Sequence, residues 1–120
     1  MLFNYFILIF VIVKKSLILK GKSEIDNLFT TGYPVSSDFV FAKVLSSDST
    51  KFLFAVSSKK FRRAVDRNRI KRLMREVTRK IDISGVKIAF IYTGKYLPTY
   101  SEVELSIKSI IGKIWHIKES

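Results

Sequence analysis

The sequence predicts a single α+β domain, a two-layer sandwich in which helices pack on one small mixed sheet in the order α-β-β-α-β-α. Two observations predict this class: three short runs have strand spacing, and three segments repeat apolar residues at helical spacing. The length of 120 residues and the hydrophobic fraction of 48% suit one hydrophobic core.

The domain is expected to span residues 16–120, preceded by an apolar N-terminal extension, residues 1–15, of unknown role. Residues 2–13 are almost entirely apolar, but a membrane-spanning helix needs about 20 such residues. Lys14 and Lys15 come after this run and no cleavage site follows, which disfavours a signal peptide. A buried or partner-bound strand, a stretch outside the domain and a start site placed too far upstream all stay open.

A short helix is expected first, over residues 24–31. The stretch SEID, from Ser23 to Asp26, has the form of a capping box, in which the serine hydroxyl accepts an early backbone N–H. Gly32 follows the helix, where glycine commonly ends helices. Residues 32–34 are then expected to form a turn.

Three strands are expected next. The segments with strand composition and spacing are residues 38–45, 51–57 and 86–92. In the first of them, Phe39, Phe41 and Lys43 are expected to point to one face. The short loop between the first two strands predicts a hairpin-type connection.

A last helix is expected to begin near Thr99. Thr99 and Glu102 form a second capping box, and Pro98 precedes it. The stripe expected to face the core consists of Val103, Ile107, Ile110, Ile111 and Ile114.

The long helix between the second and third strands carries most of the excess charge. Residues 59–80 hold eleven basic and two acidic side chains, whereas the other 98 residues hold eleven basic and eight acidic ones. The formal net charge of the whole chain is +12. This concentration predicts one positively charged face, and polyphosphate is the usual partner of such a face.

The apolar residues of this helix predict which side faces the core. They recur at helical spacing and are Ile70, Leu73, Met74, Val77 and Ile81. The basic residues recur at intervals of four, and like charges at that spacing oppose helix formation by roughly 0.2–0.5 kcal/mol per pair. Because Asp66 and Glu76 can neutralise only a few of them, the pattern indicates a counter-charge outside the chain.

Three interpretations fit this helix to different degrees. A solvated face that serves solubility does not require clustered charge. A membrane-surface helix would need an apolar face that the domain core already uses. Nucleic-acid binding is favoured, and arginine outnumbers lysine between residues 67 and 79, which suits bidentate phosphate contacts. Asn68 is either an ordinary exposed residue or a group that hydrogen-bonds RNA or neighbouring backbone.

Candidate catalytic and metal-binding groups are sparse. The chain has no cysteine, which excludes disulfides and cysteine-based zinc sites, and its one histidine, His116, is expected to be an exposed helix-end residue. The ten carboxylates are scattered, with no spacing typical of metal binding or acid–base catalysis. We therefore predict no catalytic residue and no metal ligand.

Residues 54–76, FAVSSKKFRRAVDRNRIKRLMRE, resemble the signature of the protein subunit of bacterial ribonuclease P. That signature is a strand, a Lys-Lys pair, an A-V-x-R-N-R run and then K-R-x-x-R-E. The matching positions are Ala64, Val65, Arg67, Asn68, Arg69, Lys71, Arg72, Arg75 and Glu76. The resemblance extends more loosely from about Leu17 to Ile114.

The resemblance implies a ribosomal protein S5 domain 2-like fold, a cytoplasmic location and a role in removing the 5′ leader of precursor tRNA. The implied partners are ribonuclease P RNA, bound 1:1, and precursor tRNA, with no membrane. The protein itself would bind no cofactor, because the RNA subunit holds Mg²⁺ and performs the cleavage. The protein would dock on that RNA through its basic helix and hold the leader in a cleft.

The RNA-docking residues implied by the resemblance are Lys59, Lys60, Arg67, Asn68, Arg69, Lys71, Arg72 and Arg75, and Arg63 joins them by helical position alone. A single-stranded leader needs aromatic stacking beside positive charge. The expected leader surface is therefore Phe29, Phe39 and Phe41 with Lys43, although most of the ten phenylalanines must be core.

The main alternative is a ribosomal-protein-like, general RNA-binding module with no part in catalysis. A DNA-binding helix is disfavoured because no helix–turn–helix partner or dimerisation segment is visible. Reconstitution with ribonuclease P RNA and precursor tRNA distinguishes a ribonuclease P subunit from a general RNA-binding module.

Overall fold

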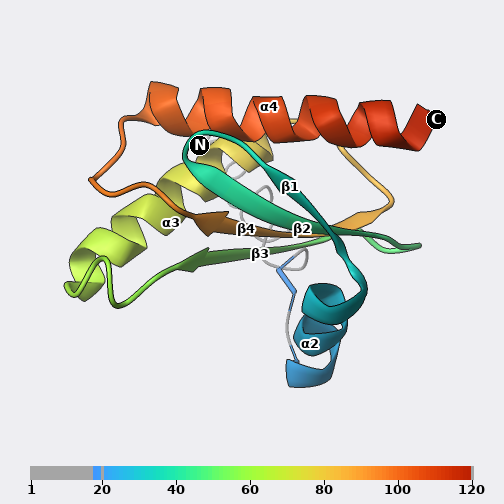
Figure 1. Cartoon of the computed structure of the whole chain (residues 1–120), viewed down its shortest axis with the longest axis horizontal. Helices are drawn as coiled ribbons and strands as arrows, with labels where there is room; N and C mark the ends of the chain where they lie inside the picture. The colour runs from blue at the N-terminus through green and yellow to red at the C-terminus, as the bar shows by residue number, and fades with distance from the viewer. Residues whose placement is uncertain (1–17, 20, 120) are drawn as a thin grey trace, which may run out of the picture.

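A computed structural model describes residues 18–19 and 21–119 of the chain, with side chains as far as Ile114. The elements are α2 (Lys22–Thr31), β1 (Tyr33–Ser36), β2 (Val40–Ser46), β3 (Lys51–Val56), α3 (Ala64–Arg79), β4 (Val86–Tyr92) and α4 (Tyr100–Glu119). The four strands form one sheet, with α3 and α4 on one face and α2 on the other (Figure 1). The predicted α+β sandwich is confirmed; the predicted extension, residues 1–15, lies outside the described residues.

The strand order is β1-β2-β4-β3, and the sheet is mixed as expected. β4 pairs antiparallel with β2 and parallel with β3, so α3 is the crossover between two parallel neighbours. The predicted hairpin between β2 and β3 is wrong, because β4 lies between them. The loop from β2 to β3 passes over the start of β4: Ser47 N–H donates to the Gly85 carbonyl, and Gly85 N–H donates to Thr50 Oγ1.

β1 occupies the segment that was expected to be a turn. Tyr33–Ser36 pairs antiparallel with β2, so the sheet has one strand more than the sequence predicted. Pro34 is tolerated there because β1 is an edge strand, where a missing backbone N–H need not break the ladder. Gly32 ends α2 as predicted, and its N–H donates to the Leu28 carbonyl.

The two predicted capping boxes have opposite outcomes. The one at Ser23 is wrong: α2 begins at Lys22, Gly21 precedes it with a φ of 95°, and no side chain caps the helix. The second box is confirmed, because Thr99 N–H donates to Glu102 Oε1 at 2.9 Å and Glu102 N–H donates to Thr99 Oγ1 at 3.3 Å. Because Gly and Ser both occur at helix N-cap positions, the SEID stretch alone could not fix the residue at which α2 begins.

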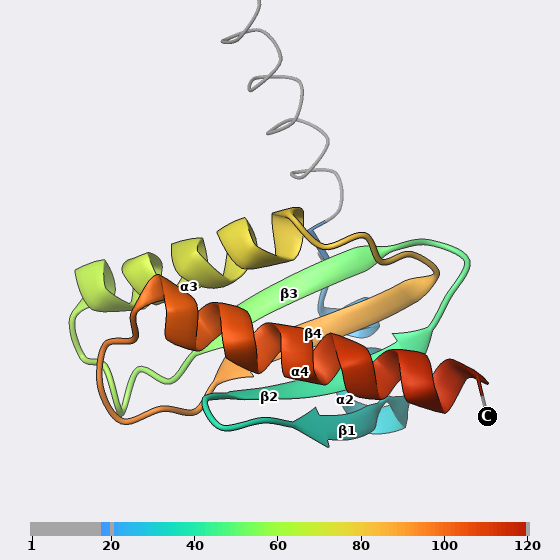
Figure 2. The ribbon, with the colours of Figure 1, turned by 90° about the horizontal axis from the view of Figure 1, so that it is seen from above.

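The main core lies between the sheet and the α3–α4 pair, which lie side by side over it (Figure 2). Ile70, Met74 and Val77 of α3 are fully buried, as their spacing predicted, and the whole expected stripe of α4 is buried too. On the opposite face, Leu28 of α2 packs against Leu19 and Ala89 in a smaller cluster. This packing fixes the rotation of α3, so its charged side faces outward.

Candidate nucleic-acid interface

The outer side of α3 presents its basic side chains to solvent. Arg63, Arg69, Arg72 and Arg75 are exposed and Lys71 is half-buried. Within the described part of the chain, the Arg69, Lys71 and Arg72 side chains make no hydrogen bond or ion pair. Their charge is therefore not neutralised by a contact within this part of the protein. Exposed Asn68, between Arg67 and Arg69, likewise uses its amide for no contact among these residues.

The C-terminal end of α3 is tied to α4 rather than left open. The Lys80 Nζ lies 5.0 Å from the centre of the Tyr100 ring, and this cation–π contact joins the end of α3 to the start of α4. Tyr100 raises the pKa of Lys80, and the carboxylates Glu104 and Glu76 add to this effect. Lys80 thus remains charged at neutral pH while serving the α3–α4 interface.

Two predicted docking residues of α3 also have contacts within the chain. Arg75 lies over the ring of Phe54, with its guanidinium carbon 5.8 Å from the ring centre. Arg67 is half-buried, and its Nη1 donates to the carbonyls of Phe61 and Arg62, at 2.9 Å each. These two arginines therefore have structural contacts that Arg69 and Arg72 do not have.

Lys59 and Lys60 lie in the turn that leads from β3 into α3 (Figure 1). Ser57 Oγ accepts the backbone N–H of Lys59 at 3.2 Å and that of Lys60 at 3.4 Å. The Lys60 ammonium donates to the Thr93 carbonyl at 3.1 Å, which ties the turn to the end of β4. Sequence reasoning missed Ser57 and Thr93, since each acts through a backbone contact that no spacing reveals.

The segment after β4 is held by a chain of hydrogen bonds. Tyr92 Oη donates to the Tyr96 carbonyl at 2.7 Å, and Tyr96 Oη donates to Glu102 Oε2 at 2.9 Å. Burial raises the pKa of Tyr92 to about 12, with the nearby Glu102 and Tyr96 adding to it. Gly94 is needed in this turn because a Cβ there would collide with the Tyr92 hydroxyl. The Thr93 carbonyl that receives Lys60 is thereby fixed.

The residues expected to bind the leader do not share one face. Phe41 and Lys43 alternate with the buried Val40, Ala42 and Val44, so they point to the α2 side of the sheet. Phe29 of α2 is half-buried and packs against the smaller cluster on that same side. Phe29, Phe41 and Lys43 therefore lie on the same side of the sheet.

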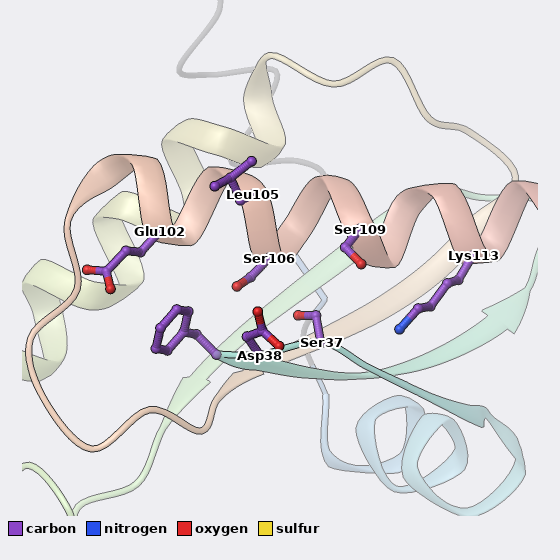
Figure 3. A pocket seen from close by; sticks show the side chains of 8 residues that line it. Ser37, Asp38, Glu102, Leu105, Ser106, Ser109 and Lys113 are labelled. Atoms are coloured by element: carbon purple, nitrogen blue, oxygen red, sulfur yellow. The ribbon is translucent and has the colours of Figure 1, made fainter.

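Phe39 lies instead on the α4 side, so its predicted place beside Phe41 is wrong. It precedes β2, which begins at Val40, and strand alternation therefore does not set its direction. Its ring packs against the main core and meets Tyr96 edge to face. Phe39 also lines a hollow between the start of β2 and α4 (Figure 3).

That hollow is acidic and hydroxyl-rich rather than basic. Its lining comprises Ser37, Asp38, Phe39, Glu102, Leu105, Ser106, Ser109 and Lys113 (Figure 3). Carboxylates line it and one lysine lies at its far end, so it does not extend the basic surface of α3. No sequence signal pointed to it, because its residues are as far apart in the chain as Ser37 and Lys113.

Among the residues that the structure describes, no three His, Cys, Asp or Glu side chains gather as a group that could hold a metal ion. In the same part of the chain, no helix has the length and hydropathy needed to cross a membrane.

Comparison with known proteins identifies the family. The family model described as Ribonuclease P matches residues 13–114. A ribonuclease P protein component of an Exiguobacterium species is 32% identical over 86% of this chain and 96% of its own length. The corresponding protein of Chlorobium phaeobacteroides is 30% identical over 85% and 87%.

Solved structures agree on the fold. The RNase P protein of Staphylococcus aureus superposes with a TM-score of 0.72 at 21% identity, covering 82% of this chain and 94% of that one. The RNase P protein of Thermotoga maritima gives 0.68 at 19% identity, over 77% and 92%. The family match over residues 13–114 and the relative at 32% identity lead to one assignment: the chain belongs to the family of bacterial ribonuclease P protein components.

Proposed function

We propose that this chain is the protein subunit that docks on ribonuclease P RNA through α3 and the Lys59–Lys60 turn, within a tRNA-processing enzyme complex. The observation that carries the proposal is the outward row of basic side chains on α3. Among the described residues, its central members make no hydrogen bond or ion pair with their side chains; they are Arg69, Lys71 and Arg72. The proposed docking residues are Lys59, Lys60, Arg63, Arg67, Asn68, Arg69, Lys71, Arg72 and Arg75.

The electrostatics of α3 favour a folded polyanion as partner. Arg67, Lys71 and Arg75 follow one another at intervals of four, where like charges repel. Bound RNA phosphates would attract each of these cations and so offset the repulsion between them. Because the major groove of A-form RNA is too narrow for a helix, the contacts are expected at phosphates, 2′-hydroxyls and junctions where strands separate.

The leader of precursor tRNA is proposed to lie on the α2 side of the sheet. Phe41 is half-buried there, and Ile91 of β4 is its neighbour across the sheet. Lys43 follows on the same face and supplies positive charge for the backbone of a single strand. Phe29 borders this surface from α2, where it also packs against the smaller cluster.

The cleavage itself is assigned to the RNA subunit with its Mg²⁺. The scattered carboxylates of the chain support this assignment, since a self-sufficient nuclease groups acidic or basic residues around the reacting phosphate. The protein would contribute affinity and orientation for the substrate, as one copy per RNA. This activity is proposed to take place in the cytoplasm, with residues 16–120 as the RNA-binding domain.

Reconstitution tests the proposal. Ribonuclease P RNA from the same organism, a precursor tRNA and low Mg²⁺ are combined with and without the protein. The protein should raise the rate of 5′-leader removal, and the protein alone should leave the precursor intact. A general RNA-binding module would leave RNA-catalysed cleavage unchanged, and that result would overturn the proposal.

A further inference from the structure

The turn between β3 and α3, residues 57–63, is called here the basic turn because it carries Lys59, Lys60, Arg62 and Arg63. Several contacts fix its backbone. Ser57 receives the N–H groups of Lys59 and Lys60 on its Oγ and that of Phe61 on its carbonyl. The Phe61 ring is buried and packs against Tyr92, with ring centres 5.8 Å apart. The start of the turn and its middle are thus anchored to the sheet.

The end of the basic turn is held by Arg67 alone among the described side chains. Arg67 lies one turn inside α3, and its Nη1 reaches back to the carbonyls of both Phe61 and Arg62. Arg63, which occupies the N-cap position, makes no capping hydrogen bond with its side chain. One guanidinium nitrogen therefore joins two successive carbonyls of the turn to the helix, a geometry that a single donor can satisfy because Nη1 carries two hydrogens.

We propose that Arg67 is a positioning residue, which presents the lysines and arginines of the basic turn to RNA by clamping the Phe61 and Arg62 carbonyls. This inference rests on the proposed RNA-binding function and separates Arg67 from the neighbouring docking residues. Arg69 and Arg72 make no such contact in the described part of the chain. Their charge is available to phosphate, whereas Arg67 has its Nη1 hydrogens engaged before RNA arrives.

A clamped turn binds more tightly than a loose one, because its backbone is already ordered. Loss of the clamp should therefore weaken contacts made by other residues, Lys59 and Lys60 above all. Arg67→Lys keeps the positive charge but replaces the rigid planar fork with a compact ammonium group on a flexible stem, whose three donors are not held in a fixed geometry. A residue that served only as a phosphate contact would lose affinity independently of the turn, whereas loss of a positioning residue would also weaken the contacts that Lys59 and Lys60 make.

The experiment measures binding of the full chain to ribonuclease P RNA by filter retention across a salt series. The expected order of affinity is wild type above Arg67→Lys, with Arg67→Lys weakened by at least about twofold, the lower end of the coupling seen between neighbouring residues. A double-mutant cycle follows with Arg67→Gln and Lys59→Gln. Their combined loss should be smaller than the product of the single losses, because both changes disable the same turn.

The control is a second double-mutant cycle, in which Arg69 is mutated in place of Arg67. Arg69 makes no hydrogen bond to the basic turn. The losses caused by Arg69→Gln and Lys59→Gln should multiply independently, because Arg69 does not hold the basic turn. If Arg67→Lys binds like wild type and its cycle is also multiplicative, the positioning role is overturned while RNA binding stands. If the wild type itself fails to bind this RNA, the proposed function fails instead.

A spectroscopic measurement on the unaltered free protein guards against variants that do not fold. In ¹⁵N-detected NMR spectra, the Arg67 guanidinium should rotate slowly about its Cζ–Nη1 bond, because both hydrogens of Nη1 are held. The exposed Arg69 guanidinium should rotate fast. Equally fast rotation of the two groups would overturn the clamp without any substitution.

Discussion

Phe39 meets Tyr96 edge to face on the α4 side of the sheet, with ring centres 5.9 Å apart and ring planes at 73°. Phe41, two residues later, faces the α2 side. Two phenylalanines that look equivalent in the sequence therefore belong to different surfaces. They form a matched pair for testing where the leader binds.

Replacing Phe41 with alanine should weaken binding of precursor tRNA that carries a 5′ leader. Base–aromatic stacking contributes roughly 1–3 kcal/mol per base, which corresponds to about a five- to 150-fold change in the dissociation constant. Mature tRNA, which lacks the leader, should bind the reconstituted complex as before. Equilibrium binding of the two RNAs to complexes with wild-type and variant protein measures the difference.

Phe39→Ala is the control for this prediction. Its ring packs against the main core, so the variant should unfold at a lower temperature, and leader-dependent binding should persist below that temperature. If Phe39→Ala removes the preference for the leader and Phe41→Ala does not, the leader surface has been placed on the wrong side of the sheet.

Replacing Arg69 and Arg72 together with alanine should weaken binding to ribonuclease P RNA without unfolding the protein. Both side chains are exposed and make no hydrogen bond or ion pair within the described residues, so their removal should leave the melting temperature nearly unchanged. If each neutralises one phosphate, the slope of log affinity against log salt should become shallower by roughly 1.4–1.8. A salt titration of binding, with circular dichroism for the fold, measures both quantities.

Lys108→Ala supplies the comparison for that double variant. Lys108 is an exposed lysine of α4, 3.9 Å from Glu104, and it lies outside the proposed surface. Its loss should change neither the affinity nor the salt slope appreciably. A drop as large as that of the arginine pair would mean that RNA senses only total charge, and the assignment of α3 as the docking helix would be wrong.

Sequence patterns predicted the parts of the fold that depend on local periodicity. In the predicted stripe of α3, Ile70, Met74 and Val77 are buried, and Leu73 and Ile81 pack against the core while partly exposed. The stripe of α4 is buried as expected, since burying one apolar face is what chiefly stabilises such a helix. The strand order was not predictable, because alternation says which residues share a face but not which strand lies alongside. Inserting β4 between β2 and β3 depends on contacts between distant segments.

The sequence predicted which charged residues form the candidate site, but it did not predict the structural role that each of them has. The charge of α3 follows from composition, and its outward direction follows from the apolar stripe. The clamp from Arg67 to the carbonyls of Phe61 and Arg62 depends on the path of the turn, which no spacing specifies. Phe39 was misplaced for a related reason: it lies one residue outside β2, where alternation no longer applies.

Glu102→Gln should make stability less sensitive to acid. The Thr99 backbone N–H, and then the Tyr96 hydroxyl, lower the pKa of Glu102. A lowered folded-state pKa contributes stability above the ordinary value of about 4.3, and that contribution is lost as the pH falls through the folded-state value. The variant should therefore melt below wild type at pH 7, and the two melting curves should converge toward pH 3.

The matched variant is Glu104→Gln, which removes the same charge two residues along α4. Among the described residues, Glu104 forms one surface ion pair, with Lys108 at 3.9 Å, and such pairs contribute little. We therefore expect the melting curves of variant and wild type to converge in acid for Glu102→Gln and not for Glu104→Gln. Parallel melting curves for wild type and Glu102→Gln at every pH would show that the Thr99–Tyr96–Glu102 bonds do not favour the ionised carboxylate.

Two glycines should respond to alanine in opposite directions. At Gly32, an added Cβ would lie 2.5 Å from the Leu28 carbonyl oxygen and 3.1 Å from that of Val44. Both are backbone atoms of packed elements that cannot easily move, so Gly32→Ala should destabilise the protein by about 1–3 kcal/mol.

At Gly112, in α4, an added Cβ would meet nothing within 4 Å, and alanine should stabilise the helix by about 0.5–1 kcal/mol. Urea unfolding of both variants measures the two shifts, and a loss of stability in Gly112→Ala would mean that α4 is not helical through this position.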